Sequence, residues 1–400
     1  MPLKEESIEE LRDRLTSELH VLMVMISNSW SGLEQTALAD TSILVQNGLK
    51  VTVLIREGSP IDEKISMESP HIRRVYAPVK VRNYLDASML KLIRHLVDEE
   101  GVNLIHCHQT SILGSIAPAL FGRNHVALVV SRHILNSHNK RDPVHALLYR
   151  RVDYILVLSR TMRRNLATTF PVPEKKLRIV NLSIDLDVFN PNLVNGRDSF
   201  RAEWNIPQDA FLVGVVGRLD PMKGQDLVVK SLAQVCRTYD NVYGMIVGNE
   251  TPGLDGAYLQ ELKDGIAQLH LEDRIFVSAG RSDIPSVLTA FDLFLMPSWS
   301  EAFGLSALEA MAMGVPTVLS RSGSAEELAY ASGAELFRQR DAYDLARKIS
   351  YLYNSPEICR HIAEQGKKFV HSDHSKPKRL HDTLEVYARC YRRRIAAQEN

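Results

Sequence analysis

The stretch from residue 291 to 316 constrains the fold most, because it places a strand, a loop and a helix directly one after another. It opens with the apolar run F-D-L-F-L-M, which Pro297 ends because proline cannot donate a hydrogen bond to a sheet ladder. From about Gly304 the residues are strong helix formers, and Gly314 followed by Pro316 predicts the helix end. A strand, a loop and a helix in this order are the repeating unit of a parallel α/β sheet.

Strand-like runs of this kind recur along the whole chain. A strand over 19–26, a helix from Gly32 to about 47 and a strand over 50–55 form a βαβ unit, which predicts a parallel sheet. A helix is expected over 84–100, where apolar residues recur on one face. Further strands are predicted near 73–76, 103–107, 126–130, 154–158, 178–181, 211–216, 245–248, 274–277 and 315–319.

The length of 400 residues suggests two domains, and the turn-rich stretch 186–198 is the predicted linker. We therefore place an N-terminal domain at 1–196, a C-terminal domain at 197–375 and a final helix at 376–400. No internal repeat interrupts this division.

The helix that follows the first stretch is suited to an anion. The unpaired N–H groups at its start, near residues 303–305, point back toward the loop that carries Glu301, and such an end binds anions. Glu309 lies further along the same helix. Two acids on either side of a phosphate site suggest a nucleotide-sugar, which has hydroxyls on both sides of its phosphates. The alternative is that both acids are merely solvated.

A second loop, G-R-L-D-P-M-K-G at 217–224, follows a predicted strand and precedes a helix. Its glycines allow close approach of the backbone to a ligand, and Arg218 and Lys223 supply charge and hydrogen bonds. The loop is neither a dinucleotide-binding fingerprint nor a P-loop. It is nevertheless suited to a diphosphate.

Histidines stand at the ends of two predicted strands in the first half. Ligands of open parallel sheets sit at the carboxyl ends of strands, so His133 lies where a catalytic or sugar-binding group belongs. His106 and His108 flank Cys107 at the end of a strand, whose successive residues face opposite sides, and no third ligand lies nearby, so no metal site is expected. The four cysteines show no C-x-x-C spacing, which indicates neither zinc nor a disulfide framework.

Charge and hydropathy restrict the partners and the location. The net charge is zero, and no nucleic-acid partner is expected. Residues 123–178, however, contain twelve basic and three acidic side chains, an excess of nine positive charges. Such a segment is either a solvated, salt-bridged surface or a face attracted to an anionic membrane. The N-terminus lacks an apolar signal core and no run of 18 apolar residues occurs. We therefore expect a cytoplasmic protein that can bind peripherally at the inner membrane face.

These motifs resemble those of the retaining glycosyltransferases of family 4. Glu301 and Glu309 match the family's two glutamates within F-G-L-x-x-x-E-A-M-A-x-G-x-P, and 217–224 matches G-R-x-x-x-x-K-G. S-R-H ending at His133 is similar to the family's histidine motif. The loop around Gly32 resembles G-G-x-E, but a serine replaces the first glycine.

Further segments resemble the family less closely. Ala279-Gly280-Arg281 is similar to the region whose backbone meets the nucleotide base, and 322–326 resembles G-G-x-P-E with serine for the first glycine. The family usually has P-N-G-x-D where this chain has N-L-S-I-D at 181–185, which puts the local turn in doubt.

The resemblance implies the α/β GT-B fold, with two Rossmann-like domains facing across a cleft and the last helix packing back on the first domain. It implies that the N-terminal domain binds the acceptor and the C-terminal domain the nucleotide-sugar. The catalytic residues it implies are His133, Glu301, Arg218 and Lys223. The donor-binding residues it implies are Gly32, Arg218, Lys223, Gly280, Arg281, Phe303, Gly304, Leu305 and Glu309.

The implied reaction moves a hexose from a UDP- or GDP-sugar to a glycan, with retention of the anomeric configuration and without a metal or other cofactor. We expect an acceptor from the cell envelope, such as a lipopolysaccharide core or a lipid-linked saccharide, with an anionic membrane surface as a further partner. Two alternatives are a nucleotide-sugar hydrolase or epimerase of the same fold and a non-catalytic nucleotide-sugar sensor.

Overall fold

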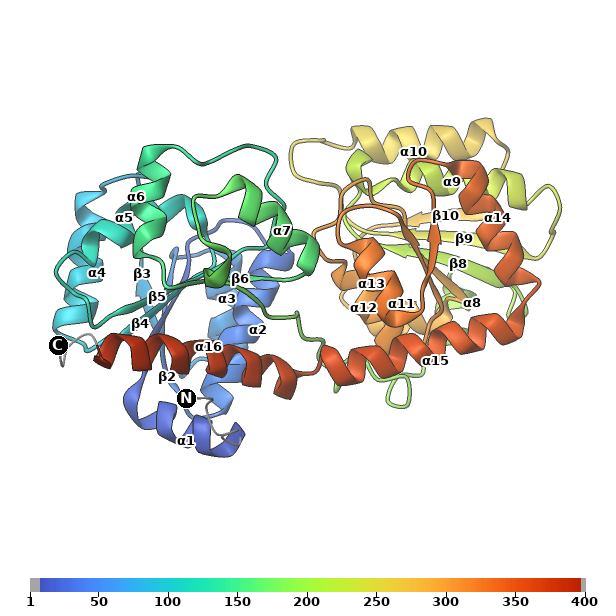
Figure 1. Cartoon of the computed structure of the whole chain (residues 1–400). Coiled ribbons are helices and arrows are strands. Elements are labelled where there is room, and N and C mark those ends of the chain that lie inside the picture. The colour runs from blue at the N-terminus through green and yellow to red at the C-terminus, as the bar shows by residue number, and fades with distance from the viewer. Residues whose placement is uncertain (1–7, 397–400) are drawn as a thin grey trace. The chain divides into compact units, whose positions relative to one another are not determined.

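The computed structural model describes residues 8–396, which form two compact units. The first unit holds the described residues up to Ser183 together with those from Lys376, and the second runs from Ile184 to Ser375. Each unit contains one parallel sheet with helices between successive strands (Figure 1). The predicted α/β class with parallel sheets is thereby confirmed.

The first unit is built on a seven-stranded sheet of order β3-β2-β1-β4-β5-β6-β7. Strand β1 pairs with β2 through Met23 and Val53 and with β4 through Met23 and His106. Its strands are β1 (His20–Met25), β2 (Lys50–Ile55), β3 (Arg73–Tyr76), β4 (Leu104–Cys107), β5 (Ala127–Ser131), β6 (Tyr154–Val157) and β7 (Leu177–Ile179). Its helices are α1 (Ile8–Glu18), α2 (Gly32–Gln46), α3 (Pro60–Glu68), α4 (Ala87–Asp98), α5 (Leu113–Ala119), α6 (Pro143–Arg151), α7 (Arg160–Thr169) and α16 (Lys376–Ala396).

The core of the first unit joins the start and the end of the chain. All residues of β1 are buried, as expected for a parallel strand that is covered on both faces. Leu384 and Tyr387 of α16 belong to the same buried cluster as Val21 and Met23 of β1. Each fully buried side chain of this size contributes about 1.5–3 kcal/mol, so α16 is an integral part of this unit.

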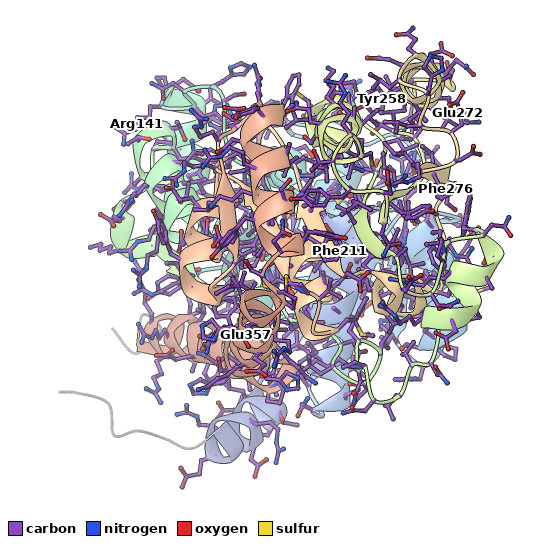
Figure 2. All side chains as sticks on the ribbon, turned by 90° about the vertical axis from the view of Figure 1, so that its right-hand side faces the viewer. Arg141, Phe211, Tyr258, Glu272, Phe276 and Glu357 are labelled. Carbon is purple, nitrogen blue, oxygen red and sulfur yellow. The ribbon has the colours of Figure 1, made fainter. Side chains whose placement is uncertain are left out.

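The second unit is built on a six-stranded sheet of order β10-β9-β8-β11-β12-β13. Tyr258, labelled in Figure 2, packs in its core, and its hydroxyl accepts a hydrogen bond from the N–H of Asp226. The strands are β8 (Phe211–Val216), β9 (Val242–Val247), β10 (Ile275–Ser278), β11 (Leu293–Met296), β12 (Thr317–Ser320) and β13 (Glu335–Phe337). The helices are α8 (Arg197–Glu203), α9 (Gln225–Val235), α10 (Ala257–Gln268), α11 (Ile284–Ala290), α12 (Leu305–Ala312), α13 (Ala325–Ser332), α14 (Ala342–Tyr353) and α15 (Pro356–Asp373).

The boundary between the units lies before the predicted linker. Residues 184–196 group with the second unit. The N–H of buried Ile184 donates to the carbonyl of His374, and a side chain on Gly196 would lie 2.5 Å from the Cβ of Ser286. Both ends of this turn-rich segment are therefore held within the second unit, whereas Val188 and Leu193 between them are exposed.

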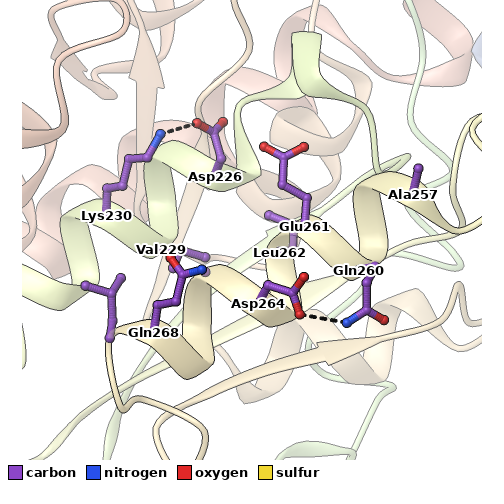
Figure 3. A pocket seen from close by; sticks show the side chains of 11 residues that line it. Asp226, Val229, Lys230, Ala257, Gln260, Glu261, Leu262, Asp264 and Gln268 are labelled. Atoms are coloured by element: carbon purple, nitrogen blue, oxygen red, sulfur yellow. Dashed lines mark hydrogen bonds and ion pairs between the residues drawn. The ribbon is translucent and has the colours of Figure 1, made fainter.

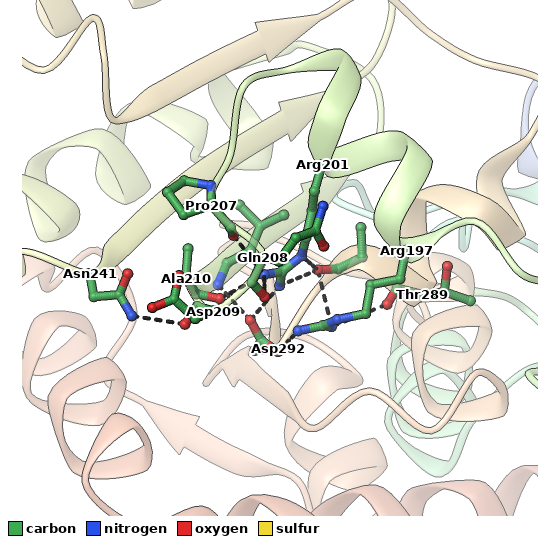
Figure 4. A network of polar contacts seen from close by, with 11 residues as sticks. Arg197, Arg201, Pro207, Gln208, Asp209, Ala210, Asn241, Thr289 and Asp292 are labelled. Atoms are coloured by element: carbon green, nitrogen blue, oxygen red, sulfur yellow. Dashed lines mark hydrogen bonds and ion pairs between the residues drawn. The ribbon is translucent and has the colours of Figure 1, made fainter.

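Helix α8 begins at the end of that segment and is anchored by one buried arginine. Arg201 is fully buried, and its guanidinium donates to the carboxylate of Asp292 at 2.7 Å (Figure 4). It also donates to the carbonyls of Ala290, Pro207, Gln208 and Ala210. Every buried donor of this side chain is used, which offsets the cost of removing a charge from water.

Candidate functional site

Two loops that leave neighbouring strands of the second unit are joined to each other. Loop 217–224 follows β8, and loop 297–304 follows β11. The N–H of Trp299 donates to the carbonyl of Met222 at 2.9 Å. Gly224 has a φ of +73°, and a Cβ there would lie 2.6 Å from the carbonyl oxygen of Pro297. Glycine is therefore required for the two loops to approach this closely.

This junction brings Lys223 and Glu301 together. The Nζ of Lys223 lies 2.9 Å from Oε2 of Glu301, and both side chains are partly buried. A third loop supports the acid, because the N–H of Ser324 donates to the carbonyl of Glu301 at 2.9 Å. A Cβ on Gly323 would lie 2.2 Å from that carbonyl oxygen, so this position also requires glycine. Glu301 is thus held by loops from three strand ends.

Arg218 stands in the same loop as Lys223 but has no protein partner. Its side chain is exposed and makes no hydrogen bond or ion pair within the described residues. Its backbone is fixed, because the side-chain amide of Gln225 donates to the Arg218 carbonyl at 2.7 Å. One cation ready for a ligand and a second one shared with a carboxylate make this loop suitable for an anion.

The start of α12 lies next to Glu301. Gly304 precedes the helix with a φ of +104°, and a Cβ there would lie 2.9 Å from the sulfur of Met296. No side chain caps this helix end, so the first N–H groups, around Leu305, are available to a ligand. Phe303 is buried and its ring lies 5.3 Å from that of His374, which anchors the loop before the helix.

Glu309 lies inside α12 without a partner. The side chain is partly buried and makes no hydrogen bond or ion pair to any residue of the described chain. Burial raises its pKa to about 8. A carboxyl group in this state gains from any ligand that donates hydroxyl hydrogen bonds to it.

The segment after β10 contributes backbone rather than a free charge. The N–H of Gly280 donates to the side chain of Asn249 at 2.8 Å. The guanidinium of Arg281 donates to Asp283 and Glu203, and these bonds raise its pKa above the usual value. The Arg281 side chain is therefore already engaged within the protein.

In the first unit, Gly32 begins α2 where the sequence predicted a helix start. The serine that replaces the family's first glycine, Ser31, caps this helix together with Glu34, whose carboxylate accepts from the Ser31 N–H at 2.9 Å. A Cβ on Gly32 would have no neighbour within 4 Å. Folding therefore does not require glycine at this position.

The histidines at the ends of β4 and β5 form a pair. Nδ1 of His108 lies 3.2 Å from Nε2 of His133, and the two rings are stacked 5.4 Å apart. Burial and the charge of Arg379 lower the pKa of His133 below its usual range. His106 is bound separately, by Tyr387 and Ser131. Within residues 8–396, no three His, Cys, Asp or Glu side chains are grouped so as to hold a metal ion.

Much of the basic segment is engaged internally. Arg151 donates to the carbonyls of Arg123 and Val126, and Arg163 pairs with Glu174. Arg123 pairs with Asp98 of α4. These contacts remove several of the charges from the exposed face that the sequence suggested. No described helix is both long and apolar enough to cross a bilayer.

A groove of the second unit lies away from these loops. It has a volume of about 740 Å³ and lies between α9 and α10, lined by Asp226, Glu261 and Gln268 among others (Figure 3). None of the residues singled out from the sequence lines it. It lies on helices, whereas ligands of open parallel sheets bind at the carboxyl ends of the strands. The loops after β8, β10 and β11 are therefore the candidate site.

Two family profiles together match most of the chain. The profile described as "Glycosyltransferase Family 4" matches residues 30–188, and "Glycosyl transferases group 1" matches residues 196–369. The two matches fall on the two sheets in chain order.

Curated relatives are similar over different lengths. A UDP-Gal:alpha-D-GlcNAc-diphosphoundecaprenol alpha-1,3-galactosyltransferase of Escherichia coli is 25% identical over 76% of this chain and 80% of its own. A D-inositol 3-phosphate glycosyltransferase of Mycolicibacterium smegmatis is 31% identical over 54% of this chain and 49% of its own length. The lipopolysaccharide core mannosyltransferase LpsB of Rhizobium meliloti is 41% identical over 29% of this chain and 33% of its own. The match thus spans about half or less of the latter two relatives.

Solved structures share the architecture. A glycosyltransferase from Rickettsia africae has a TM-score of 0.83 at 18% identity and covers 93% of this chain and 98% of its own. Anabaena HepE, solved with UDP and glucose, has a TM-score of 0.79 at 21% identity over 92% of this chain and 99% of its own. These likenesses show the GT-B fold. The two profile matches, which together span most of the chain, show that it belongs to the group 1 and family 4 glycosyltransferases.

Proposed function

We propose that this protein is a retaining glycosyltransferase that moves a hexose from a UDP- or GDP-sugar to a cell-envelope glycan. The observation that carries the proposal is the junction of the loops after β8 and β11. There the Arg218 side chain has no partner among the described residues, and Lys223 faces Glu301 at 2.9 Å. A diphosphate placed between these cations satisfies Arg218 and competes with Glu301 for Lys223.

Different residues of the second unit contact different parts of the donor. Arg218 and Lys223 neutralise the diphosphate, which becomes more negative as the sugar leaves, so their stabilisation grows toward the transition state. The sugar of the donor and its adjacent phosphate are bound by Glu301 and by the N–H groups of Phe303, Gly304 and Leu305. Glu309 accepts hydrogen bonds from the ribose hydroxyls.

Three further positions complete the proposed site. The backbone of Gly280 and Arg281 contacts the nucleotide base, since the Arg281 guanidinium is engaged by Asp283 and Glu203. Gly32 lets the donor or acceptor approach the start of α2, where a side chain has open space. His133 binds the sugar.

The anomeric configuration is retained if the acceptor attacks the sugar from the same face from which the leaving group departs. The departing phosphate oxygen then takes the acceptor proton, and no protein nucleophile is needed. We propose that no metal takes part, because two cationic side chains supply the charge that a divalent ion supplies in other phosphate sites.

We propose an acceptor that is lipid-linked or part of a lipopolysaccharide. The galactosyltransferase relative is named for a diphosphoundecaprenol substrate and the mannosyltransferase relative for the lipopolysaccharide core, which supports this class. Helix α6 exposes Val144 and Leu147 next to the exposed Arg150. Apolar side chains beside a cation suit the surface of an anionic bilayer, so we propose peripheral binding at the cytoplasmic face.

The decisive experiment follows the sugar itself. The purified protein is incubated with radiolabelled UDP-glucose, UDP-galactose, GDP-mannose or UDP-N-acetylglucosamine, with and without a lipid-linked saccharide acceptor. We expect label in the lipid fraction and release of UDP or GDP that depends on the acceptor. Free sugar released at the same rate without acceptor would indicate a hydrolase, and binding without any turnover would indicate a sensor.

A further inference from the structure

A buried ion pair lies next to His108 of the histidine pair in the first unit. Arg379 of α16 and Asp40 of α2 are 2% and 3% exposed. The guanidinium donates to both carboxylate oxygens, with Nη2 2.6 Å from Oδ2. It also donates to the carbonyls of Val180 and Asn181, in the segment that departs from the family's P-N-G-x-D. Asp40 is thus held in one position by the C-terminal helix.

His108 lies between this carboxylate and His133. Its side chain is buried, and its Nε2 lies 3.9 Å from Oδ2 of Asp40 and has no hydrogen-bond partner among the described residues. Its Nδ1 lies 3.2 Å from Nε2 of His133. Burial and the neighbouring His106, His133 and Arg379 keep the pKa of His108 well below its usual value, so the ring is neutral and carries one proton.

The position of that proton follows from the charges around the ring. A carboxylate attracts an N–H and repels a lone pair, so Asp40 favours the proton of His108 on Nε2. Nδ1 of His108 is then a lone pair. Because two lone pairs facing each other at 3.2 Å repel, Nε2 of His133 must carry its proton and donate it. Nδ1 of a neutral His133 is consequently a hydrogen-bond acceptor.

His106 does not take part in this chain of contacts. Its Nδ1 lies 2.7 Å from the Tyr387 hydroxyl, and its Nε2 lies 2.8 Å from the Ser131 hydroxyl. Both ring nitrogens are satisfied by hydroxyl groups, which can donate or accept. The ring stands 4.4 Å from that of His108 and contributes to the lowered pKa of His108.

We propose that Asp40, fixed by Arg379, acts through His108 as a positioning residue that sets His133 in the Nε2–H form, so that Nδ1 of His133 accepts a hydrogen bond from a substrate hydroxyl. The inference rests on the proposed function only for the substrate; the tautomers are a property of the protein alone. We call the contacts from Asp40 through His108 to His133 the relay. Helix α16 takes part in it, because Arg379 of this helix fixes Asp40.

The first test measures the tautomers directly. The protein is labelled with ¹⁵N at the histidine rings, and long-range ¹H–¹⁵N correlation spectra are recorded at neutral pH without ligand. The signals of His108 and His133 are assigned with the variants His108→Asn and His133→Ala. We expect a proton on Nε2 and none on Nδ1 in both rings. A proton on Nδ1 of either ring would overturn the relay, whatever the protein's activity.

The part of Asp40 is tested with a charge-neutral pair. The double variant Asp40→Asn, Arg379→Gln removes both ions, whereas either single variant leaves one buried charge alone and strongly destabilises the fold. With the fold verified by circular dichroism, we expect His108 to lose its preference for Nε2–H. An unchanged His108 tautomer in the folded double variant would show that Asp40 does not determine the position of this proton.

Kinetics separate positioning from simple packing. The oxygen of an asparagine side chain can take the place of Nδ1 of His108, whereas phenylalanine keeps the ring but has no acceptor. With UDP-glucose and GDP-mannose as probes, we expect His108→Phe to lower kcat at least tenfold with KM changed less than threefold. His108→Asn should be at least fivefold more active than His108→Phe. Equal losses in both variants would contradict the relay, and a wild type without turnover would count against the proposed function alone.

Discussion

The ammonium group of Lys223 lies 2.9 Å from the carboxylate of Glu301, although 77 residues separate the two along the chain. The pair exists because Gly224 lets its loop approach Pro297 and because the Trp299 N–H bonds to Met222. A diphosphate that binds here must therefore either separate Lys223 from Glu301 or bind Lys223 while Glu301 stays paired with it. The first predictions concern that competition.

Replacing Arg218 and Lys223 by alanine should weaken UDP or GDP binding at least tenfold in isothermal titration calorimetry. Each cation contributes about 1.5–3 kcal/mol through charge-assisted hydrogen bonds. Lys230→Ala is the matched control, because within residues 8–396 the exposed Lys230 of α9 pairs with Asp226 alone. A double variant that binds as tightly as the control would disprove the phosphate assignment.

The two acids should differ in what they hold. Glu309→Gln is expected to weaken free UDP or GDP as well as the nucleotide-sugar, since the ribose belongs to both. Glu301→Gln is expected to lower turnover while leaving the affinity for the free nucleotide within about threefold, a change below about 1 kcal/mol. The measurement combines calorimetry with initial rates. Equal loss of nucleotide affinity in both variants would refute this division.

Glu309 should also make stability depend on pH. Its pKa is raised from 4.5 to about 8 in the folded state, so the folded protein binds more protons than the unfolded chain between these values. Stability therefore falls as pH rises through this window. Glu309→Gln should raise the free energy of unfolding at pH 8.5 by about 1–2 kcal/mol relative to its effect at pH 5, less than the full shift implies because the side chain is partly exposed. Glu364→Gln, at an exposed position on α15, should show no such difference in urea denaturation.

Two glycines should respond oppositely to alanine. Gly224→Ala places a Cβ 2.6 Å from the Pro297 carbonyl at a φ of +73° and should separate the two loops, with at least tenfold weaker nucleotide binding. Gly265→Ala, within α10, meets no atom within 4 Å and should stabilise the protein by about 0.5–1 kcal/mol with unchanged nucleotide affinity. Thermal denaturation and calorimetry check both. Unchanged binding in Gly224→Ala would show that the loop junction does not shape the site.

Membrane binding should depend on α6. In liposome co-sedimentation, the protein is expected to bind anionic vesicles but not neutral vesicles. Binding to the anionic vesicles should weaken as the salt concentration rises from about 0.1 to 0.5 M. Val144→Ser with Leu147→Ser should reduce binding at least threefold, because both side chains are exposed. Arg163→Ala serves as the control, since Arg163 is paired with Glu174. Equal binding to both vesicle types would leave a soluble acceptor as the better proposal.

Local features of the sequence determined the elements and the loops. The strand at 211–216 and the strand at 50–55 lie where their apolar runs predict them, and α12 ends before Gly314 as the glycine and proline indicate. Helix α8 was missed because its stability depends on buried Arg201, whose partners are carbonyls that lie together only after folding. Propensity within a turn-rich stretch does not report such contacts.

The tertiary structure alone decided which polar groups meet. The sequence shows Asp40 as an acid inside the helix that begins at Gly32, but nothing near it names Arg379, which lies 339 residues away. It likewise names no distant partner for Arg281, whereas folding brings Glu203, 78 residues away, to its guanidinium. The strands and helices that the sequence predicted follow from interactions over a few residues, whereas α8 depends on tertiary contacts of Arg201. Charge pairing depends on which distant loops the two sheets bring together, and that is settled only when the chain has folded.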